Sequence, residues 1–238
     1  MSDKSFVRFG GVAGILLGIS AWVAVALYYA LVPAAQQLPV TDANAYLASL
    51  AQNSTGTLLF NGLYALIALW SLIATVAVYY RLRSVGEAWA FFAVLIGAFN
   101  AAATIVASLQ QLAHLKYLAT LYQTAPETAA IALGEPAPLN PFNLMTAGLT
   151  SIWFLVTALL ILRSEMPKLL GYLGLVAFAD LAVGFVASLA SIPLVPVIAA
   201  GIAGAVGGPI FWLWLGVLLR RDASRVDEQR GMAYSAAA

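Results

Sequence analysis

Cysteine is absent from this sequence, and histidine occurs once, at His114. Without cysteine the chain has no disulfide, no cysteine-ligated iron–sulfur cluster, no thiolate zinc site and no cysteine nucleophile. A single histidine also excludes a transmembrane haem held by two histidines, and a multi-histidine metal centre, within this chain. We therefore expect no cofactor and no metal ion.

Charged residues are scarce as well, at 9% of the chain, whereas hydrophobic residues make up 63%. The mean hydropathy is +0.92. A soluble domain has about 25% charged and about 45–50% apolar residues, so this composition excludes a water-soluble fold. The net charge of +1 gives no reason to expect a nucleic-acid partner. The partner that the composition requires is the lipid bilayer.

Six apolar segments are long enough to cross a membrane, 9–33, 57–80, 88–113, 144–162, 168–192 and 194–219. Crossing about 30 Å of hydrocarbon takes roughly 20 helical residues. The sequence therefore predicts an all-α polytopic membrane protein, with a single transmembrane domain of six helices over residues 1–219. Residues 220–238 are charged and then alanine-rich, and we expect them to form a disordered cytoplasmic tail.

The basic residues lie almost entirely on one side of the predicted membrane. Ten of the eleven lysines and arginines fall on the side of the two termini, and only Lys116 falls on the other. By the positive-inside rule the side rich in basic residues is cytoplasmic. We therefore expect both termini in the cytoplasm, which agrees with an even number of spans.

The two larger loops then lie outside, and each has the pattern of a short interfacial helix. In the loop of residues 34–56, apolar residues with helical spacing predict the first of these helices. In the loop of residues 115–143, the capping box formed by Thr124 and Glu127 predicts the second, over about 125–133.

Apart from Lys168, the first residue of its segment, Asp180 is the only charged residue in the six apolar segments. A carboxylate at the bilayer centre costs roughly 2.5–3.5 kcal/mol, so this side chain should face protein or trapped water. At 1.5 Å per residue, Asp180 lies about 18 Å along its segment and Asn100 about 20 Å along its own, both counted from the cytoplasmic side. We expect these two side chains to meet near the midplane.

Polar residues in the four middle segments recur at helical spacing and so form polar faces. From Asn100 the face continues outward through Thr104 and Gln111, and from Asp180 it continues through Ser188. We expect these segments to line a polar cleft that opens to the outside and holds a ligand or proton site. The first and sixth segments carry almost no polar side chains, and we expect them to pack against lipid or a partner.

The same polar residues have a second interpretation. Asn, Ser and Thr commonly bridge membrane helices for about 0.6 kcal/mol each. A hydrogen-bonded pair of Asp180 and Asn100 would be one more such bridge. The sequence leaves the functional and the packing interpretation open.

Small residues recur every fourth position in the first and sixth segments. They are Gly10, Gly14 and Gly18 in the first segment and Ala200, Gly204 and Gly208 in the sixth. Faces of this kind allow helices to approach closely. Either the two segments pack on each other, or one of these faces binds a second membrane protein.

Two stretches resemble a known family. The stretch Arg163–Leu175, RSEMPKLLGYLGL, looks like the "Pro-basic-x-Leu-Gly-x-x-Gly" turn of an uncharacterised family of six-helix bacterial membrane proteins, a domain of unknown function. The stretch Phe211–Gly216, FWLWLG, is similar to the last helix of that family. The resemblance covers about a third of the chain. It implies six helices and a location in the bacterial cytoplasmic membrane, and it brings no catalytic residue.

Three classes of function are compatible with these observations. We favour a non-enzymatic integral membrane protein that binds a small or lipidic ligand, or that serves as an accessory subunit of a membrane complex. The loops are short, and the sequence shows no nucleophile–base pair, phosphate loop or metal-ligand spacing. The alternative is a proton-coupled secondary transporter in which Asp180 carries the proton. An enzyme that works at the membrane is the third class.

Overall fold

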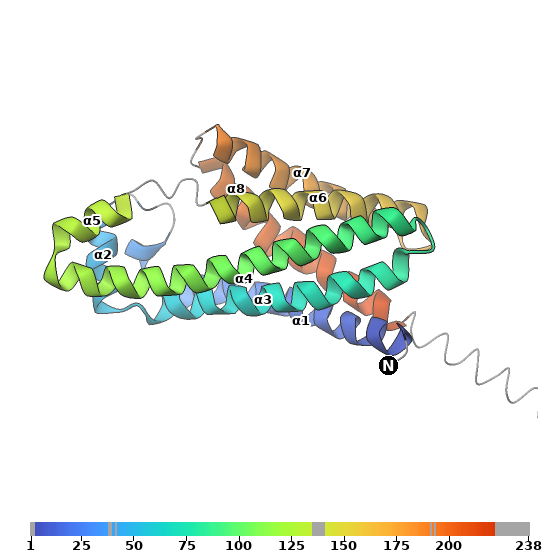
Figure 1. Ribbon diagram of the computed structural model, residues 1–238, viewed down its shortest axis with the longest axis horizontal. Helices are drawn as coiled ribbons and strands as arrows, with labels where there is room; N and C mark the ends of the chain where they lie inside the picture. Colours follow the sequence, from blue (N-terminus) through green and yellow to red (C-terminus); the bar gives the residue numbers. More distant parts are fainter. Residues whose placement is uncertain are drawn as a thin grey trace, which may run out of the picture.

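The computed structural model describes residues 3–37, 40, 42–134, 141–190, 192 and 194–221, and within these residues every regular element is a helix. The long helices are α1 (Asp3–Leu31), α3 (Thr55–Leu82), α4 (Glu87–Thr124), α6 (Pro141–Arg163) and α7 (Lys168–Leu189). They run side by side along the long axis of the molecule (Figure 1).

The last span consists of three parts. It begins as α8 (Leu194–Ile202), passes through a π-helical turn, η3 (Ala203–Gly207), and continues as an α-helix over residues 208–221. This helix therefore extends to Arg221 and includes the first two residues of the predicted tail. The rest of the predicted tail lies outside the described residues.

Five of the described helices are long and apolar enough to cross a membrane, and α6 contains a shorter apolar stretch, Ala147–Arg163. Residues 3 and 221 lie at the same end of the bundle, as an even number of spans requires (Figure 1). The prediction of an all-α polytopic membrane protein is confirmed.

Both larger loops contain short helices, as predicted. These are α2 (Ala43–Gln52) and α5 (Pro126–Gly134), with a single 3-10 turn, η1 (Ala34–Gln36), before α2. Asp42 caps α2, because its carboxylate accepts hydrogen bonds from the backbone N–H groups of Asn44 and Ala45 at 2.9 and 3.0 Å. Both helices lie at the end of the bundle opposite residues 3 and 221 (Figure 1).

Helix α4 is longer than predicted, because it ends at Thr124 instead of near residue 113. Its last turns are supported by a small apolar cluster in which Leu115 and Leu118 pack with residues of α2 and α5. Thr124 ends α4, and its hydroxyl donates to the carbonyl oxygen of Leu121 at 3.2 Å. The capping box therefore predicted α5 at nearly the right place but assigned the wrong role to Thr124.

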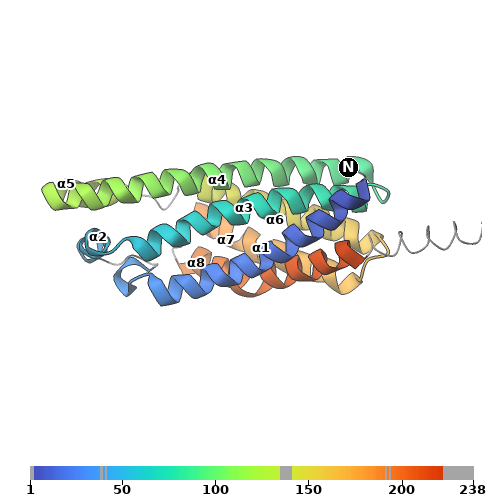
Figure 2. The ribbon, with the colours of Figure 1, turned by 90° about the horizontal axis from the view of Figure 1, so that it is seen from below.

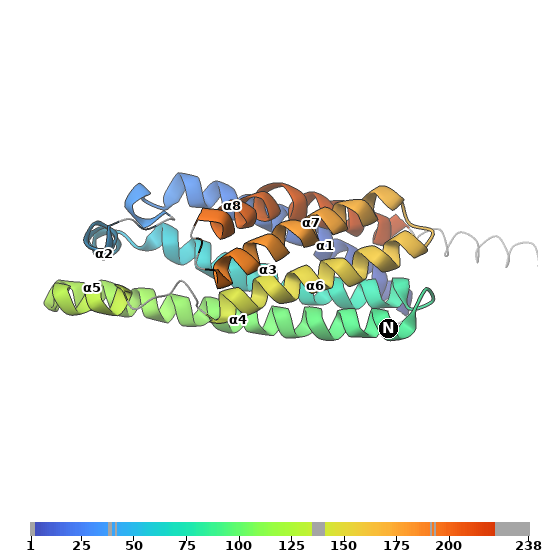
Figure 3. The same ribbon diagram turned by 90° about the horizontal axis from the view of Figure 1, so that it is seen from above.

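The long helices pack in chain order: α1 on α3, α3 on α4, α4 on α6, α6 on α7, and α7 on α8 and η3. Figure 3 shows α4, α6 and α7 in this order, and Figure 2 shows α1 beside the end of the last span. The contact of the last span with α1 closes the bundle. Helix α6 consequently lies between α4 and α7.

The last span contributes directly to the core, contrary to the prediction that spans one and six face lipid or a partner. Phe211, Leu215 and Leu219 are at most 1% exposed. The indole rings of Trp212 and of Trp153 on α6 are stacked, with centroids 4.7 Å apart. The prediction was wrong because it equated an absence of polar side chains with a lipid-facing position. In a membrane, helices associate through shape and close packing as well as through polar groups.

A glycine seam joins α1 to residues 208–221. A β-carbon added at Gly216 would lie 2.6 Å from the carbonyl oxygen of Gly11 and 2.8 Å from the amide nitrogen of Ile15. One added at Gly18 would lie 2.8 Å from the carbonyl oxygen of Pro209. The two spans therefore pack on each other, which is the first of the two possibilities that the glycine pattern left open.

The face of α1 formed by Gly10, Gly14 and Gly18 is covered by the protein itself. A β-carbon at Gly10 would meet the methyl group of Ala77 on α3, and one at Gly14 would lie 3.2 Å from the Cα atom of Gly216. A second membrane protein cannot use this face without first separating these helices. An interaction through the region around Gly204 stays a prediction.

Candidate functional site

Asp180 lies on α7 and faces the π-helical turn of the last span. Its carboxyl group lies close to the backbone of Ala203. One carboxyl oxygen, Oδ2, is buried and has no hydrogen-bond partner among the described residues. A buried polar atom without a partner is unusual in proteins and calls for a ligand, a proton or a water molecule.

The register of α7 against the last span explains this position. One turn after Asp180, a β-carbon added at Gly184 would lie 2.9 Å from the β-carbon of Ala199. The two helices are antiparallel, so a step of four residues backward on α7 corresponds to a step of four residues forward on the last span. The glycine at position 184 allows α7 to approach closely enough for Asp180 to reach the backbone at Ala203.

The π turn itself occupies a run of small residues, AGAVGG, that begins at Ala203. Glycine weakens an α-helix by about 1 kcal/mol relative to alanine, so this run is a favourable place for a departure from regular α-helix. A β-carbon at Gly208 would lie 2.7 Å from the carbonyl oxygen of Ala203, and glycine removes that clash. Single π turns inside α-helices are frequent at functional sites.

A second helix also holds the turn. Trp22 of α1 donates a hydrogen bond from Nε1 to the carbonyl oxygen of Ala205, at 2.8 Å. The turn is therefore held by α7, which packs against it, and by α1, which donates a hydrogen bond to the carbonyl oxygen of Ala205. This bond gives a backbone group inside the membrane a partner.

One side of this region is open. No atom of the described residues outside the neighbouring backbone lies within 4 Å of a β-carbon added at Gly201, Gly204 or Gly207. These glycines recur every third residue, so the bare backbone extends through the turn. The region thus combines a half-buried carboxyl group with one buried oxygen, a π turn and uncovered backbone.

The predicted pairing of Asn100 with Asp180 is wrong. Asn100 lies on α4, where its side-chain oxygen accepts a hydrogen bond from the hydroxyl of Thr150 on α6, at 3.2 Å. Helix α6 packs between α4 and α7 (Figure 3). The estimated depths of the two residues agreed, but depth along a helix does not determine which helices are neighbours. The contact of Asn100 with Thr150 is an interhelical bridge of the kind that the packing interpretation describes.

The residues of the predicted outward polar path also lie on two separate helices, α4 and α7. Thr104 and Gln111 are half-buried on α4, and Ser188 is half-buried on α7. The hydroxyl of Thr104 donates to the carbonyl oxygen of Asn100, and that of Ser188 to the carbonyl oxygen of Gly184, both at 2.9 Å within their own helices. The structure therefore does not bring the five predicted site residues together around one cleft.

The sequence did not reveal that Asp180 faces the last span, or that Trp22 of α1 bonds to the turn there. The run from Ala203 to Gly208 was the available signal, but its glycines were assigned only to a packing face. Trp22 gave no signal, because a tryptophan in an apolar segment is most simply a lipid-facing or core residue. Among the described residues, no group of three side chains suited to a metal ion occurs.

The helices, their apolar lengths and their packing define a multi-pass α-helical membrane protein. The family called Domain of unknown function (DUF4386) matches residues 12–217, and the chain belongs to this family. The resemblance seen in the sequence is confirmed, and the match covers most of the chain instead of about a third. No curated protein and no solved structure matches the chain.

Proposed function

We propose that this protein is a non-enzymatic membrane protein that binds a small ligand at Asp180, opposite the π turn of the last span. The observation that carries the proposal is the buried Oδ2 atom of Asp180, which has no hydrogen-bond partner among the described residues. A carboxylate in hydrocarbon is costly unless it has a partner, and such residues in membrane spans usually belong to ligand, ion or proton sites.

The chemistry of the site points to a ligand that is cationic or donates hydrogen bonds. A carboxylate accepts hydrogen bonds and attracts positive charge. The carboxyl group lies against the backbone of the last span at Ala203. The backbone near this point carries little side-chain cover, because a β-carbon added at Gly204 would meet no atom of the described residues within 4 Å. A bound proton is the smallest such ligand.

Thermal unfolding of the purified protein in a mild detergent tests this proposal. We would screen small inorganic and organic cations for compounds that raise the Tm of the wild type, and then repeat the measurement with Asp180→Asn. Asparagine keeps the size and the hydrogen bonding of aspartate but cannot ionise. We expect Asp180→Asn to have nearly the wild-type Tm without ligand and to lose the ligand-induced rise.

Two further variants sharpen this experiment. Asp180→Leu should lower the Tm even without ligand, because the larger branched side chain has to fit where the carboxyl group lies against the last span. Asn100→Leu is the matched control, since it removes a polar side chain at similar depth on a helix that does not adjoin α7. The control should keep the ligand response, and its loss would instead support one cleft shared by both residues.

A proton-coupled secondary transporter is the second candidate, and the same carboxylate would be its proton site. Irregular helices that face a midplane ionisable residue are a feature of secondary transporters. Uptake by proteoliposomes that depends on a pH gradient, and on Asp180, would favour transport. A stoichiometric partner that purifies with the protein in mild detergent would favour an accessory subunit. For each of these roles we propose the bacterial cytoplasmic membrane as the location.

A further inference from the structure

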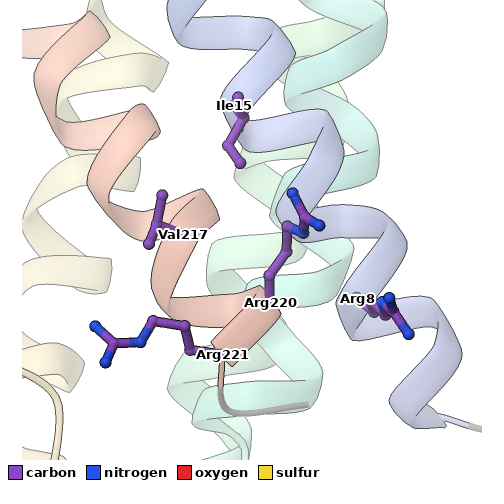
Figure 4. A pocket seen from close by; sticks show the side chains of 5 residues that line it. All are labelled: Arg8, Ile15, Val217, Arg220 and Arg221. Atoms are coloured by element: carbon purple, nitrogen blue, oxygen red, sulfur yellow. The ribbon is translucent and has the colours of Figure 1, made fainter. Parts of the chain in front are cut away.

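A pocket of about 290 Å³ lies at the end of the bundle near residues 3 and 221, between α1 and the last span (Figure 4). It is lined by Arg8 and Ile15 of α1 and by Val217, Arg220 and Arg221 of the last span. Among these lining residues, all of them described, three are arginines and none is acidic. The pocket is far along the bundle from α2 and α5, and it is separate from the Asp180 region.

The glycine seam builds this pocket. A β-carbon added at Gly11 would lie 2.7 Å from Cγ of Arg220, so the stem of this arginine rests where α1 has no side chain. Figure 4 shows Arg220 extending from the last span toward α1, with Ile15 and Val217 farther along the two helices and Arg8 nearer the start of α1. Ile15 lies farthest from the helix ends and Arg8 and Arg221 lie nearer to them, while the guanidinium group of Arg220 reaches back to about the level of Val217 (Figure 4).

We infer that this pocket binds an anionic phospholipid, with the phosphate at Arg8 and Arg220 and the start of an acyl chain along Ile15 and Val217. Guanidinium groups bind phosphate oxygens through paired hydrogen bonds. Val217 is 44% exposed, so an acyl chain can reach it from the side of the bundle. Basic pockets between membrane helices on the cytoplasmic side are typical sites for anionic lipid headgroups.

The position of the pocket agrees with this ligand. Ten of the eleven lysines and arginines lie on this side of the predicted membrane, which the positive-inside rule assigns to the cytoplasm. Anionic lipids give the cytoplasmic leaflet a negative surface potential. Arg8 and Arg221 lie near the helix ends and Ile15 lies farther in, which is the order of headgroup and acyl chain in a phospholipid of that leaflet.

A second pocket at the same end provides a control. It is lined by Arg81, Ser84, Val85, Arg163, Ser164 and Glu165. Glu165 lines this pocket together with the two arginines, and its negative charge disfavours a phosphate group there. Replacing Arg81 and Arg163 by glutamine therefore removes positive charge from the same end of the bundle without changing the proposed lipid site.

The test is native mass spectrometry of the full chain, titrated with phosphatidylglycerol or with phosphatidylcholine. The test variant is Arg8→Gln/Arg220→Gln/Arg221→Gln, and the control is Arg81→Gln/Arg163→Gln. We expect the wild type and the control to bind phosphatidylglycerol about tenfold more tightly than phosphatidylcholine. The test variant should bind the two lipids equally. If it does not fold, Arg220→Gln alone should reduce the preference at least about threefold.

Three results would overturn the inference. The test variant could keep the full preference for phosphatidylglycerol. The control could lose the preference to the same extent, which would indicate diffuse attraction to all basic residues at this end. Soluble glycerol phosphate could raise the Tm as much as phosphatidylglycerol does, which would indicate a site for a free phosphate compound. A loss of lipid binding with an unchanged Asp180 ligand response leaves the proposed function intact.

Discussion

The last span has glycines in two regions, 201–208 and position 216, and their surroundings differ. At Gly216 an added β-carbon would lie 2.6 Å from a backbone atom of α1, whereas at Gly204 it would meet nothing within 4 Å among the described residues. The first glycine closes a helix–helix seam, and the second leaves backbone uncovered beside a π turn. A spacing of small residues therefore predicts that helices can approach, but it does not say where they do so.

The largest expected loss of stability is at the glycine seam between α1 and the last span. In Gly216→Ala the new methyl group would clash with the backbone of Gly11 and Ile15, which cannot move aside as a side chain can. We expect a loss of about 1–3 kcal/mol in the free energy of unfolding, as for other overpacked interiors. Thermal unfolding in mild detergent would show this as a lower Tm. A wild-type Tm in Gly216→Ala would contradict the close packing of the last span on α1 at this position.

A smaller effect is expected where α1 holds the π turn. Trp22→Phe removes the hydrogen bond to the carbonyl oxygen of Ala205 and keeps an aromatic ring. The expected loss of stability is about 0.5–1.5 kcal/mol, the usual net value of one hydrogen bond. If the turn positions the ligand site, this variant should also weaken the ligand response at Asp180. Trp89→Phe, an exposed tryptophan on α4, is the matched control and should change neither quantity.

The smallest effect on stability is expected at Gly204, where an added β-carbon would meet no other atom of the described residues. Gly204→Ala adds a methyl group to free space, and alanine favours helix by up to about 1 kcal/mol over glycine. We expect a Tm equal to that of the wild type or slightly higher, together with a weaker ligand response, because the methyl group covers backbone beside Asp180. A Tm that falls as far as in Gly216→Ala would mean that position 204 is also packed, and the contrast would then fail.

The sequence was sufficient to predict the helices, because the apolar length of a segment is a property of that segment alone. Apolar length predicted the spans, and the distribution of basic residues agrees with the placement of residues 3 and 221 at one end of the bundle (Figure 1). The extension of α4 to Thr124 was missed because Leu115 and Leu118 are supported by α2 and α5, which are distant in sequence.

The candidate site could be predicted only in part. Asp180 stood out because one charge in an apolar segment is costly wherever its helix packs. The residues that Asp180 faces did not stand out in the sequence, because the order of helices in the bundle depends on side-chain shape at many positions. The prediction paired Asp180 with Asn100, a residue at similar depth, whereas the structure places it against the backbone of Ala203. Backbone groups carry no side-chain signal that a polar pattern could reveal.

The most direct test of the central claim, that Asp180 is a ligand site and not a sealed packing contact, is chemical labelling of its carboxyl group in membranes. Dicyclohexylcarbodiimide, an apolar reagent for carboxylic acids, would be applied to the wild type, and mass spectrometry would locate the adduct. We predict labelling at Asp180 that decreases when a compound that raises the Tm is added. No labelling at Asp180, or equal labelling with and without that compound, would contradict the account.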